Sequence, residues 1–154
     1  MLNPNLQFNV LAQFNVLAGL PPHDHSALQK DIKVKAGLAY TLSEGLIVAV
    51  EDESGTEVID KHTSAAVAGG QPPDVPWLVI EGNDQANGAM AGKCTCLRIH
   101  TGMVFQVETS ESFTIGDLCR ADAGVIKPLS VANEQTIGQV IGVNSSAGTV
   151  VVQA

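Results

Sequence analysis

The sequence has few basic residues. Its 154 residues include 8 Lys and Arg against 16 Asp and Glu, which gives a formal net charge of −8. An acidic surface repels a phosphate backbone, so this balance argues against a nucleic-acid partner. No apolar run reaches the roughly 18 residues that a membrane span needs, and no basic residue precedes Lys30. We therefore expect neither a membrane partner nor a secretory signal, and a protein made in a cytoplasm.

Aromatic residues and cysteines are also scarce. The chain has one Trp, one Tyr and four Phe, and its three cysteines are Cys94, Cys96 and Cys119. An odd number of cysteines in a chain without a secretory signal does not indicate a disulfide framework. We expect all three to be reduced thiols in or near the core.

One group of residues has the chemistry of a zinc site. Thiolates and imidazoles bind zinc well, and Cys94, Cys96 and His100 could be joined by His23 and His25 from an earlier connector. Structural zinc sites, however, usually place roughly two to four residues between their cysteines, so that a turn brings both sulfurs to one ion. A single intervening residue on a strand holds them apart. We predict no metal ion and no other cofactor.

The sequence carries no catalytic signature. It lacks a G-x-S-x-G elbow and a P-loop, and its four histidines are scattered. The acidic cluster of residues 51–53 with Glu57 and Asp60 is expected to form one solvated turn, without the spacing of a calcium loop. We predict no catalytic residue and no enzymatic activity.

Short β-branched runs separated by Gly, Pro, Asn and Ser dominate the chain after residue 31. They predict strands over residues 32–36, 46–50, 76–81, 93–101, 103–108, 117–121, 125–129, 136–143 and 149–153. Strands of this length and spacing are typical of an all-β protein, a small sandwich or barrel of short antiparallel strands. Hairpin connections are expected at residues 122–124 and 145–148.

The N-terminal segment has a different composition. Residues 1–20 contain no charged side chain, and the hexapeptide QFNVLA occurs twice in tandem, at 7–12 and 13–18. Pro21 and Pro22 end this stretch, and a polar connector leads to Asp31. We therefore divide the chain into an extended arm with its connector, residues 1–31, and a β-domain, residues 32–154.

The arm is the strongest candidate for an interaction site, because monomers rarely expose a contiguous apolar patch. Its burial would also need backbone hydrogen bonds, as when a strand is added to a sheet edge. We expect it to bind another chain; the alternative is that it packs on its own domain as a terminal strand. The predicted partner-binding residues are Phe8, Val10, Leu11, Phe14, Val16, Leu17 and Leu20.

Four segments resemble the small all-β capsid decoration (cement) proteins of tailed bacteriophages. They are IKVKAGLAYTLSEGLIVAVED at 32–52, VPWLVIEGNDQANG at 75–88, MVFQVETSESFTIGDLCRADAGVIKPL at 103–129 and IGQVIGVNSSAGTVVVQA at 137–154. The first is similar to the opening hairpin of these proteins and the last to their closing hairpin. The arm lies outside the resemblance.

The resemblance implies a β-tulip-like fold and a protein without enzymatic activity. Such a protein binds the outer surface of a bacteriophage capsid and stabilises it by bridging neighbouring subunits of the major capsid protein, often as a trimer. It would be assembled in the host cytoplasm and located on the virion. This function agrees with an acidic β-domain that carries an apolar arm.

The sequence is also compatible with two other functions. A tail- or fibre-associated β-domain could bind a host surface glycan, and would then stack exposed aromatic rings such as those of Trp77 and Tyr40 on the sugar. A small hydrolase or metal-dependent enzyme would use His100 and the thiols.

Overall fold

The computed structural model describes residues 16–18, 29–64, 75–82, 92–131 and 134–154. Within these ranges the chain forms strands and no helix, which confirms the predicted all-β class. No helix long and apolar enough to cross a membrane occurs in the described residues. The strands are β1 (Val16–Ala18), β2 (Gln29–Val34), β3 (Ile47–Glu53), β4 (Thr56–Lys61), β5 (Pro76–Glu81), β6 (Lys93–Arg98), β7 (Val104–Glu108), β8 (Leu118–Asp122), β9 (Val125–Pro128), β10 (Gly138–Asn144) and β11 (Thr149–Gln153).

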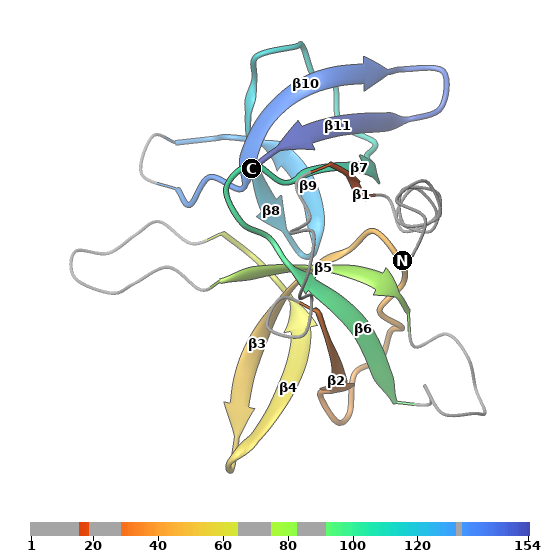
Figure 1. Cartoon of the computed structure of the whole chain (residues 1–154), viewed down its shortest axis with the longest axis vertical. Helices are drawn as coiled ribbons and strands as arrows, with labels where there is room; N and C mark the ends of the chain where they lie inside the picture. The colour runs from red at the N-terminus through yellow and green to blue at the C-terminus, as the bar shows by residue number, and fades with distance from the viewer. Residues whose placement is uncertain (1–15, 19–28, 65–74, 83–91, 132–133) are drawn as a thin grey trace, which may run out of the picture.

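The strands form two sheets, one above the other in Figure 1. The lower sheet is a closed barrel in the order β2-β4-β3-β5-β6, and the upper one is a six-stranded sheet in the order β1-β7-β11-β10-β8-β9. Each described strand pair is antiparallel except β2 with β4, which run parallel and close the barrel. The predicted hairpins at residues 122–124 and 145–148 are confirmed as the β8–β9 and β10–β11 connections.

The structure corrects the prediction for residues 32–61. The acidic cluster does not form one turn: its residues lie on the paired strands β3 and β4, which are joined at Ser54 and Gly55, both with positive φ. The opening hairpin implied by the resemblance is not formed, because β2 pairs with β4 and β6 and not with β3. Strand β4 is absent from the predicted strands because its successive residues Val58 and Ile59 are both buried, which breaks the alternation of apolar and polar residues.

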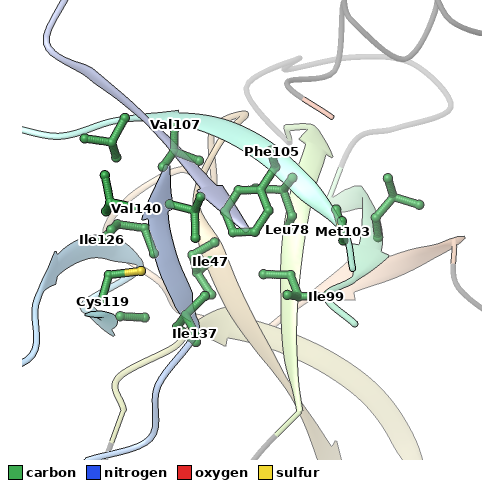
Figure 2. Packing of buried hydrophobic residues seen from close by; sticks show 14 of the residues in the cluster. Ile47, Leu78, Ile99, Met103, Phe105, Val107, Cys119, Ile126, Ile137 and Val140 are labelled. Carbon is green, nitrogen blue, oxygen red and sulfur yellow. The ribbon is translucent and has the colours of Figure 1, made fainter. Parts of the chain in front are cut away.

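A single hydrophobic cluster joins the two sheets. Ile47 and Leu78 of the barrel pack with Met103 and Phe105, which lie at the start of the upper sheet (Figure 2). A second cluster fills the barrel itself and contains Cys94, Cys96 and Trp77. Because the first cluster is shared, burial of apolar surface couples the stability of the barrel to that of the upper sheet.

Backbone hydrogen bonds strengthen this junction. The Ile47 N–H donates to the Gly124 carbonyl at 2.8 Å, and the Gly124 N–H donates to the His62 carbonyl at 2.9 Å. The Ser64 N–H donates to the Ala121 carbonyl at 2.8 Å, and the Ala121 N–H donates back to the Ser64 hydroxyl at 3.0 Å. The β8–β9 turn is therefore held against the segment that leaves β4.

Two strands include residues of the expected arm and connector. Strand β2 begins at Gln29, inside the expected connector, and pairs with β6. Strand β1 comes from the second QFNVLA copy and pairs with β7, with Val16 opposite Phe105 and Ala18 opposite Val104. Both strands are thus parts of the sheets.

Candidate interaction surface

The six-stranded sheet has one buried and one outward face. Along β7 and β11 the alternate residues Phe105, Val107, Val150 and Val152 are buried in the shared core. Residues between them point outward, since successive side chains of a strand project to opposite faces. The outward face therefore consists of side chains that the core does not use.

Most of this outward face carries no charge. We call it the uncharged face and define it by Val104, Gln106, Leu118, Gln139, Ile141, Val151 and Gln153 on β7, β8, β10 and β11, with Ile115 from the adjoining turn. Cross-strand pairing makes part of it continuous: Val104 lies opposite Gln153, Gln153 opposite Gln139, and Gln139 opposite Leu118.

Three large aliphatic side chains of the uncharged face are open to solvent. Ile115 is 73% exposed, Leu118 46% and Ile141 41%. Single exposed aliphatic residues are common on protein surfaces and need no explanation. Several on one face are typical of a surface that another molecule covers.

Ile115 lies in a turn that hydrogen bonds hold in place. The Asp117 N–H donates to the Thr114 carbonyl at 3.2 Å, and the Thr114 N–H donates to the Asp117 carboxylate at 2.8 Å. This second bond, to a backbone donor, lowers the pKa of Asp117. Gly116 takes a φ of +100° in the turn, and its N–H donates to the Val140 carbonyl at 2.8 Å. The turn is thereby attached to β10 beside Ile141.

A β-bulge directs Ile141 outward. The β10–β11 register shifts between Val140 and Gly142, which places Ile141 as the extra residue. A Cβ on Gly142 would lie 3.3 Å from the Val151 side chain. Glycine at this position therefore adds no side chain to the surface beside Ile141.

Ion pairs border the uncharged face at the β8–β9 edge. Lys127 Nζ lies 3.1 Å from an Asp122 oxygen, and Arg120 Nε lies 3.4 Å from a Glu134 oxygen. Hydrogen bonds from the Ser130 hydroxyl and from the backbone N–H groups of Ser130 and Val131 lower the pKa of Glu134. The charges here are paired within the chain.

The barrel exterior, by contrast, is charged. Lys30 pairs with Glu57 at 3.3 Å, and Lys35 pairs with Glu51 at 2.6 Å. The Tyr40 hydroxyl donates to the Asp60 carboxylate, and this bond raises the pKa of Tyr40 to about 12. Surface ion pairs of this kind contribute little to stability but keep the surface hydrated.

The two aromatic residues expected for glycan stacking are not both available. Trp77 is only 7% exposed and packs in the barrel core, with Lys30 Nζ 5.9 Å from its ring centroid. Tyr40 is more exposed, but Lys61 Nζ lies 4.0 Å from the centroid of its ring. Trp77 therefore offers no free ring face to a sugar.

The three cysteines are reduced and buried, as predicted. Cys94 and Cys96 lie inside the barrel, where desolvation raises the pKa of the Cys96 thiol. Burial also raises the pKa of Cys119 to about 11. Both shifts favour the thiol over the thiolate that a metal would need.

His100 follows the end of β6 and is not part of the cluster that contains Cys94 and Cys96. Its Nδ1 is 3.1 Å from the Thr101 carbonyl oxygen. Among the described residues no group of three or more His, Cys, Asp and Glu could hold a metal ion, and His23 and His25 lie outside those residues.

The structure places two of the seven predicted partner-binding residues. Val16 and Leu17 belong to β1, which lies on the chain's own β7 in the isolated chain, as in the terminal-strand alternative. The predicted residues Phe8, Val10, Leu11, Phe14 and Leu20 lie outside the described residues.

Comparison of the chain with protein-family models, curated proteins and solved structures finds no significant match in any of the three.

Proposed function

We propose that the chain is a structural virion protein that binds the outer surface of a tailed-bacteriophage capsid. It stabilises the shell by bridging neighbouring subunits of the major capsid protein, and it self-associates, with a trimer favoured. The uncharged face supports this function most directly. Covering Ile115, Leu118 and Ile141 releases water from apolar surface, whereas covering the barrel exterior would desolvate charges.

The identity of the partner comes from the sequence resemblance over residues 32–154. The β10–β11 hairpin agrees with the closing hairpin of decoration proteins, although the opening hairpin differs. A shell repeats one surface many times, so weak contacts by many copies add through avidity. A face whose members come from four strands and a turn suits such repeated contacts.

The position of the arm supports an orientation in which the uncharged face meets the shell. Strand β1 lies at the β7 edge of the six-stranded sheet, and β7 contributes Val104 and Gln106 to the uncharged face. The residues that precede β1 therefore start from the rim of the surface that we propose meets the shell. In this arrangement the barrel points away from the shell.

Cosedimentation with empty heads purified from the phage that encodes the chain tests the function. The wild-type chain should sediment with the heads and saturate. The double variant Ile115→Asp/Ile141→Asp should lose at least about tenfold in affinity, since it buries two charges in the contact. The matched control Thr41→Asp/Val75→Asp adds the same charge to exposed positions on the barrel side and should bind as the wild type does.

Trp77 fluorescence checks that each variant is folded. Failure of the wild-type chain to bind heads would overturn the proposed function. Equal binding by the wild type and both variants would place the contact elsewhere than the uncharged face.

A further inference from the structure

Within the described residues, strand β7 is paired unequally on its two edges. Toward β11 it is paired along its whole length, from Val104 to Glu108. On the opposite edge β1 covers only Val104 and Phe105. Beyond Glu108, the Thr109 hydroxyl donates to the Ile126 carbonyl of β9 at 3.0 Å, which brings β9 against the end of β7. Three residues of this edge therefore lie between β1 and β9.

A groove of about 600 Å³ opens at these three residues. We call it the β7 groove; it is lined by Gln106, Val107 and Glu108, by residues 43–46 of the barrel, and by Gly124, Val125 and Thr149. Leu46, Val107 and Val125 supply apolar surface, and the remaining residues are mostly polar.

The backbone of β7 is oriented for an added strand in this groove. The Thr109 N–H donates to the Gly148 carbonyl at 2.9 Å, toward β11. Hydrogen-bonding residues alternate along an antiparallel strand, so the N–H and C=O groups of Gln106 and Glu108 point to the other edge, where the groove lies. Added strands bind through such groups, and side-chain pockets set their specificity.

The register of β1 shows which residues would follow β7 into the groove. The β1–β7 register shifts between Val16 and Ala18, and Val16 lies opposite Phe105. Because the strands are antiparallel, a ladder that continues without a further shift sets residue 15 opposite Gln106, 14 opposite Val107 and 13 opposite Glu108. Directly opposed residues share a face of the sheet. Phe14 would then face the apolar side with Val107, and Gln13 and Asn15 the outward side.

We propose that the β7 groove binds the hexapeptide Gln-Phe-Asn-Val-Leu-Ala of this chain as an added strand, and that both tandem copies fit it. The second copy, residues 13–18, contains β1, and the first copy, residues 7–12, offers the same side chains at the same spacing. The arm thus has two registers six residues apart. At ~3.3 Å per residue, a change of register moves the residues that precede the bound copy by roughly 20 Å.

Disulfide trapping distinguishes the two registers. Gln106→Cys is combined with Asn15→Cys for the second copy, with Asn9→Cys for the first, or with Asn3→Cys as a control outside the repeat. The native cysteines are buried and do not compete. Under mild oxidation we expect cross-links within single chains for Asn15→Cys and for Asn9→Cys, each at least about tenfold faster than for Asn3→Cys, since bridged Cα atoms must lie within about 7 Å.

Two results would overturn this inference. If Asn9→Cys reacts no faster than Asn3→Cys, or only between chains, the first copy does not replace the second. If neither repeat position reacts, the groove does not bind the arm.

Hydrogen exchange of the Gln106 and Glu108 amides gives an independent test without new cysteines. Phe8→Asp and Phe14→Asp should each leave protection within about twofold of the wild type, because one intact copy remains. In the double variant the protection of these amides should fall at least about tenfold. In the control Leu2→Asp/Leu6→Asp it should equal that of the wild type. Equal loss in Phe14→Asp and in the double variant would show that only one register exists.

Discussion

The barrel and the six-stranded sheet differ in how they treat their edges and surfaces. Closure through β2 and β4 leaves the barrel without a free edge, and its exterior carries paired charges. The upper sheet keeps two edges, β1 and β9, and exposes Ile115, Leu118 and Ile141 on an outward face that is mostly uncharged. We therefore propose that contacts with other molecules are made by the six-stranded sheet and not by the barrel.

The largest expected effect tests whether the two regions fold together. Phe105 is fully buried in the cluster that both sheets share, so Phe105→Ala should lower the free energy of unfolding by about 3–5 kcal/mol. Trp77 fluorescence reports on the barrel. The midpoint of urea denaturation followed by this fluorescence should shift by as much as the midpoint followed by circular dichroism. An unchanged Trp77 transition would show that the barrel folds independently.

A smaller effect is expected within the sheet alone. A Cβ on Gly138 would collide with the carbonyl oxygen of Gln153 and lie 2.8 Å from Val152 Cγ1. Gly138→Ala should therefore cost about 1–3 kcal/mol of stability. In the control Gly142→Ala the new methyl meets only the Val151 side chain, at 3.3 Å, and the reduced entropy of the unfolded chain offsets much of the strain. Similar losses in both variants by denaturant titration would contradict this account.

The smallest effect concerns the barrel exterior and appears only in alkali. The bond to Asp60 raises the pKa of Tyr40 from 10.0 in the unfolded chain to about 12. Stability from this bond is complete below pH 10 and is lost as the pH rises toward 12, because the unfolded chain ionises first. Tyr40→Phe should remove this pH dependence, which unfolding curves measured between pH 9 and pH 12 would show. A slope retained in the variant would assign it to other groups.

The sequence predicted strands best where alternation and turn residues agree. Strand β5 and strand β11 have the predicted bounds, because Pro76 and Gly148 mark their starts clearly. The β8–β9 hairpin was predicted from Asp122, Ala123 and Gly124, and the last two do take positive φ. Local sequence signals were sufficient to predict these elements.

Features that depend on tertiary contacts could not be predicted from the sequence. The parallel pairing of β2 with β4 depends on barrel closure, which leaves no local signal. The uncharged face was missed because its members come from four strands and a turn. Ile141 reaches this face through a bulge that shifts the register by one residue. The apolar arm, in contrast, was visible from composition, although only the structure shows that Val16–Ala18 reach β7.

Electron cryomicroscopy of phage heads with and without the protein tests the central claim most directly. We predict added density on the outside of the shell, with the six-stranded sheet in contact with the major capsid protein and the β3–β4 hairpin pointing into solvent. Density that contacts the shell through the barrel, or heads that look the same with and without the protein, would contradict the account.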